Sequence, residues 1–200
     1  MYASACVGGL VLRNNRSIRL FKSDGSRLPA STAYEIGQVW DMDIESMDNL
    51  KPPHIEDVKV LRRELSGTRE GLKEFLLDRL QPWRGGPDSI FDGLIRVTST
   101  GKGYISETAG VPNASTGFWI PDYGLTRFDD ESRQYRYENS FGSTNPHGLR
   151  YITYVGFQPP IDSIPSGSLV RLSLARWWRP EDSDPDFELR CYLQLSGWYL

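Results

Sequence analysis

The segment 36–45 alternates strictly between two kinds of side chain over most of its length. Trp40, Met42 and Ile44 are apolar, and an acid follows each of them. The three acids are Asp41, Asp43 and Glu45. Successive side chains of a β-strand point to opposite faces, so a repeat of two places one set on a core and the other in water. The pattern predicts a half-buried strand and excludes an amphipathic helix here.

Most of the remaining chain consists of shorter apolar or aromatic runs separated by Gly, Pro, Asn and Asp clusters. Such runs with turn residues between them are typical of strands. The expected strands cover 3–12, 17–21, 54–61, 89–97, 102–106, 116–120, 124–128, 133–138, 149–157, 168–178 and 187–199. Many short strands indicate an all-β barrel or sandwich class.

One helix is expected, over residues 68–80. Ser66 and Thr68 offer N-terminal caps, and the leucines and Phe75 that follow form an apolar stripe with charges elsewhere. Pro82 and the glycine pair at 85–86 end it. The helix is predicted to be the single substantial one in the chain.

A faint internal repeat links segment 34–44 with segment 164–174. In each, a turn glycine (Gly37 or Gly167) is followed by one polar residue, two apolar residues and then alternation. A glycine that admits positive φ is common before the long bent strand of a five-stranded barrel. The predicted fold is therefore all-β: two tandem OB-like small β-barrels with one substantial helix. The first barrel is placed at residues 1–88, with the helix near 68–80, and the second at 89–200.

The compartment is expected to be the cytoplasm. No apolar run reaches the roughly 18 residues that a membrane span needs, and the first ten residues lack the basic start of a signal peptide. Cys6 and Cys191 are the only cysteines and have no metal-site spacing, so both are predicted to be buried, inert thiols. No membrane contact is expected.

Arginine and aromatic residues concentrate in the second half of the chain. Residues 91–200 hold 18 of the 24 aromatics, and nine of their ten basic residues are arginines. Such a mixture suits base stacking and planar recognition, and it also suits packed interfaces. Strand alternation puts at least one of the consecutive tryptophans on a face with an arginine. The candidate binding residues are Arg176, Trp177, Trp178, Arg179, Tyr135, Arg136, Tyr137 and Arg150. The alternative is that these aromatics fill a small barrel or pack one barrel on another.

Catalytic chemistry has little support in the residues. His54 and His147 are the only histidines, lack ligand spacing, and are expected to have surface or hydrogen-bonding roles. The acids at 41, 43 and 45 could hold a metal, but a solvated strand face explains them better. We therefore predict no enzyme activity, no cofactor and no metal site.

Several segments together resemble the prokaryotic dual OB-containing domain family. The most specific are residues 173–178 (Ser-Leu-Ala-Arg-Trp-Trp) and 191–199 (Cys-Tyr-Leu-Gln-Leu-Ser-Gly-Trp-Tyr). The others are 6–9 with 18–20, 53–57, 103–106, 117–121 and 151–156. The resemblance spans nearly the whole chain. It implies tandem OB folds linked to bacterial conflict or phage-defence systems, and it assigns no catalytic residues.

Two functions are therefore expected, both non-catalytic. The first is a module of an anti-phage or conflict system that binds single-stranded nucleic acid or a nucleotide-like group through its second barrel. The second is an adaptor that docks a defence-system effector protein through the same surface. Residues 91–200 hold ten basic and thirteen acidic residues. Binding driven by phosphates therefore requires a locally concentrated arginine patch.

Overall fold

The fold is that of a computed structural model, which describes residues 4–129, 131, 133–137, 148–184 and 186–200. The chain forms two compact units, Met1–Leu80 (unit 1) and Gln81–Leu200 (unit 2). The division lies ahead of the boundary expected at 88/89, and the assignment of one barrel to each half stays a prediction. Strands dominate both units, with one short α-helix, which confirms the predicted OB-like, β-rich fold class.

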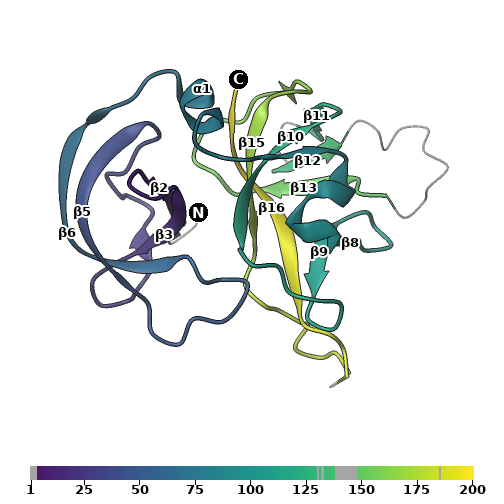
Figure 1. Ribbon diagram of the computed structural model, residues 1–200. Helices are drawn as coiled ribbons and strands as arrows, with labels where there is room; N and C mark the ends of the chain where they lie inside the picture. The colour runs from purple at the N-terminus through teal and green to yellow at the C-terminus, as the bar shows by residue number, and fades with distance from the viewer. Residues whose placement is uncertain (1–3, 130, 132, 138–147, 185) are drawn as a thin grey trace. The chain divides into compact units, whose positions relative to one another are not determined.

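Unit 1 is built around a four-stranded sheet in the order β2-β3-β6-β5. Its strands are β1 (Ser4–Ala5), β2 (Val7–Val11), β3 (Arg16–Phe21), β4 (Leu28–Pro29), β5 (Gln38–Ser46) and β6 (Asp57–Thr68). The β2–β3 and β5–β6 pairs are antiparallel, whereas β3 and β6 run parallel. β5 and β6 curve together as two long strands (Figure 1). The short strands β1 and β4 pair separately.

The alternation predicted for β5 is confirmed. Trp40, Met42 and Ile44 are half-buried, and the acids between them are exposed. The buried core of unit 1 is small among the described residues: Ala5, Ile18, Leu20, Leu28 and Val58. A buried ion pair between Arg19 Nε and Asp57 Oδ1, 2.7 Å long, joins paired positions of β3 and β6 and fixes their register.

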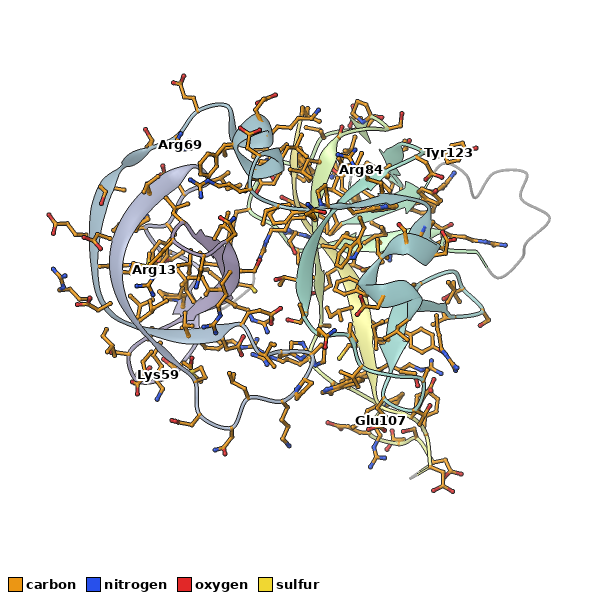
Figure 2. The ribbon with its side chains drawn as sticks, viewed as in Figure 1. Arg13, Lys59, Arg69, Arg84, Glu107 and Tyr123 are labelled. Atoms are coloured by element: carbon orange, nitrogen blue, oxygen red, sulfur yellow. The ribbon has the colours of Figure 1, made fainter. Side chains whose placement is uncertain are left out.

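The helix is present but shorter than predicted. α1 spans Leu72–Leu77 and starts after Gly71, which has φ 58°. The expected cap residue Thr68 instead ends β6, because pairing with Gln38 extends that strand. The Phe75 ring on α1 contacts two guanidinium groups: that of Arg69, which is labelled in Figure 2, lies 4.4 Å from the ring centroid, and that of Arg79 lies 4.8 Å from it.

Unit 2 contains the larger sheet, in which the main path of strands is β14-β11-β12-β13-β16-β15-β10-β7. Its strands are β7 (Trp83–Gly85), β8 (Arg96–Val97), β9 (Gly103–Ser106), β10 (Thr116–Pro121), β11 (Leu125–Arg127), β12 (Gln134–Tyr137), β13 (Tyr151–Tyr154), β14 (Ser163–Ile164), β15 (Leu169–Leu174) and β16 (Arg190–Tyr199). Two short 3-10 turns, η1 (Pro87–Ser89) and η2 (Phe91–Gly93), follow β7. β9 pairs with the first half of β16.

The core of unit 2 holds eighteen buried apolar or aromatic residues among those described. They come mainly from β12, β13, β15 and β16. Every second side chain is buried on β12, on β13 and along most of β16, and five residues of six are buried on β15. The other side chains of β12, β13 and β16 are half-exposed, so one face of these strands is open for contacts.

The two repeat glycines lie as predicted. Gly37 has φ 88° and precedes β5, and Gly167 has φ 77° and precedes β15. Both strands then form an antiparallel hairpin with the next long strand, β6 or β16. Their places in the two topologies are equivalent.

The prediction for one cysteine is wrong. Cys191 is buried on β16, but Cys6 is exposed, because the expected strand 3–12 breaks at Cys6 into β1 and β2. No helix in the described part of the chain has the length and apolar character needed to cross a membrane.

Candidate ligand-binding site

The predicted Arg-Trp-Trp-Arg group lies just beyond β15, which ends at Leu174 rather than at the expected residue 178. Trp178 still pairs with the sheet through two backbone hydrogen bonds. Its N–H donates to the Arg190 carbonyl (3.0 Å), and the Arg190 N–H donates to the Trp178 carbonyl (2.9 Å). The Trp178 side chain is 51% exposed, whereas Trp177 packs against the core of unit 2. The alternation expected for the two tryptophans is therefore present.

Trp178 is part of a row of aromatic rings. Its ring centroid lies 6.1 Å from that of Tyr192, which in turn lies 6.1 Å from that of Tyr104. Tyr192 follows Arg190 by two residues on β16, so it is on the same strand face as the residue that Trp178 pairs with. The bridge to Arg190 thus positions Trp178 beside Tyr192.

Next to this row is an open hollow of about 410 Å³, all of it within unit 2. We call it the Trp178 hollow; its lining residues are Thr98, Thr100, Lys102, Gly103, Tyr151, Thr153, Trp178, Tyr192 and Leu193. The lining combines aromatic faces, threonine hydroxyls and one cation. Its volume falls within the roughly 300–1,000 Å³ of small-molecule sites.

A tight turn supplies the threonines and the lysine. The Gly101 N–H donates to the Thr98 carbonyl (2.9 Å), and the Lys102 N–H donates to Thr98 Oγ1 (3.1 Å). Gly101 has φ 88° and lies under the Arg150 side chain, so a Cβ there would come within 2.6 Å of Arg150 Cβ. The predicted site residue Arg150 therefore packs over the turn that lines the hollow.

On one side, the aromatic surface continues through β12 and β13. The Tyr151 ring meets the exposed Phe128 edge-on at 5.4 Å, and the Arg136 guanidinium lies 5.1 Å from the Phe128 ring centroid. Arg136 and Tyr151 are paired neighbours on these two strands. Arg136, a predicted site residue, is thus close to the Trp178 hollow.

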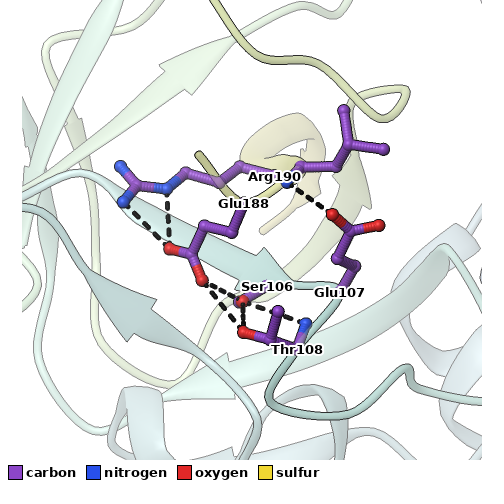
Figure 3. A network of polar contacts seen from close by, with 6 residues as sticks. Ser106, Glu107, Thr108, Glu188 and Arg190 are labelled. Atoms are coloured by element: carbon purple, nitrogen blue, oxygen red, sulfur yellow. Dashed lines mark hydrogen bonds and ion pairs between the residues drawn. The ribbon is translucent and has the colours of Figure 1, made fainter. Parts of the chain in front are cut away.

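On the other side of the hollow, the Arg190 guanidinium contacts two aromatic rings and one carboxylate. Its guanidinium lies 4.3 Å from the Tyr104 ring centroid and 4.6 Å from that of Phe187. It also forms an ion pair of 2.9 Å with Glu188, which accepts hydrogen bonds from Ser106 and Thr108 (Figure 3). The Ser106 hydrogen bond is the main reason that the pKa of Glu188 is lowered. This network holds Arg190 in place beside Tyr104.

Two predicted site residues are not on this surface. Tyr135 and Tyr137 are buried in the core of unit 2, because the Tyr-Arg-Tyr alternation of β12 points Arg136 outward and both rings inward. Both hydroxyls form hydrogen bonds within unit 2: that of Tyr135 donates to the Ile161 carbonyl, and that of Tyr137 donates to the Asp122 carboxylate. Burial raises the pKa of both hydroxyls. They cannot stack on a ligand at the surface.

Most of the residues that line the hollow are not predicted from the sequence. Lys102, Tyr192 and the three threonines were not singled out, although β16 carries a readable signal. Its residues alternate between buried Cys191 and Leu193 and half-exposed Arg190 and Tyr192. Arg176 and Arg179 are exposed beside the tryptophans, outside the hollow's lining.

Other candidate chemistry is dispersed. His54 is buried in unit 1, so of the two roles expected for it, surface or hydrogen-bonding, the surface role is wrong; His147 lies outside the described residues. Within the described ranges, no three His, Cys, Asp or Glu side chains gather as metal ligands. Asp41, Asp43 and Glu45 are exposed on their strand.

A family model described as a dual OB-containing domain matches residues 1–198. Searches of the curated proteins and of the solved structures returned no match.

Proposed function

The chain belongs to the dual OB-containing domain family, and from this premise we propose that it is a non-catalytic binding module. In this proposal, unit 2 binds single-stranded nucleic acid or a nucleotide-like group in the Trp178 hollow. One observation carries the proposal: a half-exposed tryptophan stands beside a second aromatic ring and a lysine at an open hollow of about 410 Å³.

The position of the hollow in the topology supports this function. OB folds bind ligands on the face of their second and third strands and with the loops after the first and fourth. If β10 and β11 count as one bent first strand, β12 and β13 are the second and third. Tyr151 and Thr153 then lie on the ligand face, Phe128 follows the first strand, and Trp178 follows the fourth.

The chemistry of the lining suits one nucleotide unit. A base has a π-face that stacks on Trp178 or Tyr192, and each such stack contributes about 1–3 kcal/mol. Lys102 lines the hollow, where its ammonium would contact a phosphate. It forms no ion pair with another described residue. Thr153 offers a hydroxyl to a sugar or a base edge; the hydroxyls of Thr98 and Thr100 hydrogen-bond to each other at 3.0 Å and keep their remaining acceptor capacity for the same groups.

The test is fluorescence anisotropy with labelled oligothymidine and oligouridine at low and at physiological salt. Trp178→Ala and Lys102→Ala should each weaken binding by about tenfold or more, and Lys102→Ala should also reduce the salt dependence. Phe157→Ala is the matched control, because Phe157 is exposed but does not line the hollow. If wild type binds neither oligonucleotide nor mononucleotide at low salt, the nucleic-acid function is wrong.

The second candidate is an adaptor that docks an effector protein through the same surface. It is favoured by the acidic excess of residues 91–200, which opposes a general attraction to polyanions. Docking through aromatic rings depends weakly on salt, so the salt series separates the two functions.

The setting is part of the proposal: a bacterial anti-phage or conflict system acting in the cytoplasm. It rests on the family resemblance described above. Where the native operon protects cells from a phage, Trp178→Ala in this chain should reduce protection in a plaque assay and Phe157→Ala should not.

A further inference from the structure

The two units share one strand arrangement. In unit 1 the sheet order is β2-β3-β6-β5, and in unit 2 the path contains β12-β13-β16-β15. In both, the first pair is antiparallel, the middle pair is parallel and the last pair is antiparallel. Each of these four strands of unit 1 therefore has a counterpart in unit 2, and β5 corresponds to β15.

The strand that covers β15 in unit 2, β10, has no counterpart on β5 in the described part of unit 1. The outer edge of β15 pairs antiparallel with β10, and the outer edge of β12 pairs with β11, which follows β10 directly. In the described part of unit 1, the sheet ends at β5 on one side and at β2 on the other. β5 is thus a nine-residue edge strand where unit 2 has a covered one.

The inward face of this edge is incompletely covered. Met42 and Ile44 on β5 are only half-buried, and Leu65, the paired neighbour of Trp40, is 49% exposed. In unit 2, β15 has five buried residues of six. An open edge with apolar residues beside it is a template for another extended chain.

We propose that the edge of β5 binds an extended segment of a partner protein, antiparallel, in the place that β10 occupies on β15. The segment alternates apolar and basic residues: the apolar side chains cover Trp40, Met42 and Ile44. The basic side chains lie beside the outward acids of β5, which are Asp41, Asp43 and Glu45; Asp43 also forms an exposed ion pair of 2.8 Å with Arg62 on β6. This partner site is separate from the Trp178 hollow and does not depend on the function proposed for it.

Charge argues against a second copy of this chain as the occupant. Two β5 strands that paired antiparallel about Asp43 would place Asp43 against Asp43 and Asp41 against Glu45. Like charges directly opposite each other destabilise a strand pair, and charged edges are a known defence against self-pairing. Asp41 already faces Glu64 on β6, so a basic side chain on the open side of β5 would reduce the repulsion between these two carboxylates.

The probe is a fluorescein-labelled peptide of alternating valine and lysine, titrated with the full chain in an anisotropy assay. Saturable binding is expected, and a peptide with glutamate in place of lysine should bind at least about tenfold more weakly. A version N-methylated on the edge that faces β5 should not bind, because it cannot form the strand hydrogen bonds. Equal binding of the methylated peptide, or no binding of the lysine peptide, would overturn the proposal.

Asp41→Lys tests the location. It should weaken binding of the lysine peptide by about fivefold or more and strengthen binding of the glutamate peptide. It should change the melting temperature little, because the new lysine gains an attraction to Glu64 and loses the attraction that Asp41 has to Arg62. Glu70→Lys is the control: it makes the same charge change in unit 1 outside the strands, and it should leave both affinities unchanged. Sedimentation of the unliganded chain should show monomers; a dimer that Asp41→Lys strengthens, because the new lysine would face Glu45 of the other copy, would identify a second copy as the occupant and refute the proposal.

Discussion

Two consecutive tryptophans in unit 2 have opposite environments, and their substitution should separate stability from binding. Trp177 packs against the core, so Trp177→Ala should lower the free energy of unfolding by several kcal/mol, up to about 3–5. Trp178 is half-exposed, so Trp178→Ala should change the melting temperature little. Thermal melts of both variants measure this contrast, and a large loss of stability in Trp178→Ala would assign that ring a structural role.

Glu188 should make the stability of unit 2 depend on pH. Its pKa is lowered in the folded chain, first by the Ser106 hydrogen bond and then by Arg190, so its stabilising effect is present above the ordinary pKa of about 4.5. The effect is lost as the pH falls through the lowered folded value. Glu188→Gln should cost roughly 1–2 kcal/mol at pH 7 and flatten the stability profile below about pH 5. Denaturant melts at several pH values measure both, and parallel profiles of variant and wild type would contradict the assignment.

At this scale the sequence predicts which residues share a face, but not which face is buried. From the sequence, all three residues of the Tyr-Arg-Tyr segment of β12 are candidate binding residues. In the structure both tyrosines are buried. The internal partners of the hydroxyls, Asp122 and the Ile161 carbonyl, make that burial possible. They come from other elements, so the sequence around Tyr135 and Tyr137 does not reveal them.

Among the elements, the two glycines before β5 and β15 offer a matched pair of substitutions. Both have positive φ, so alanine at either position should destabilise the chain by about 1 kcal/mol. Gly37→Ala should cost more, because its Cβ would lie 3.0 Å from the Arg69 carbonyl oxygen, whereas nothing lies within 4 Å of the Cβ at Gly167. Chemical denaturation of the two variants measures the difference; an equal cost would show that the contact with Arg69 relaxes freely.

The repeat was visible in the sequence because local turn and alternation signals define it. The helix boundaries were not, because β6 pairs as far as Thr68 and takes the expected cap residue into a strand. Pairing between distant strands overrides local capping preference when it satisfies more backbone groups.

The Trp178 hollow illustrates the same limit. It brings together the turn at 98–102, the start of β13, the residues after β15 and β16. The sequence identified Trp178 by composition and alternation alone. Lys102 and the threonines become its neighbours only through the pairing of β9 and β13 with β16.

At the scale of the whole molecule, the two units should unfold separately. Unit 1 has five buried apolar residues in its core and unit 2 has eighteen, counted over the described residues. Unit 1 should therefore unfold first, because less apolar surface is buried there. Two transitions are expected in calorimetry.

Two matched leucine substitutions assign the transitions. Leu20 in unit 1 and Leu172 in unit 2 are both buried, and each Leu→Ala change should cost about 2–5 kcal/mol. Leu20→Ala should move the lower transition and Leu172→Ala the upper one. A single transition that both variants move would show that the units unfold as one.

Because one cysteine is exposed and the other is buried, the rate of thiol alkylation reports on the opening of unit 2. In the folded state an alkylating reagent meets the exposed Cys6 at once, whereas Cys191 on β16 reacts only when unit 2 opens. The slow phase of thiol modification therefore counts opening events of the strand next to the Trp178 hollow. Because that phase is read under native conditions, a ligand that binds only the closed state would lengthen its time constant by a factor of one plus the ratio of free ligand concentration to Kd, without any label on the ligand.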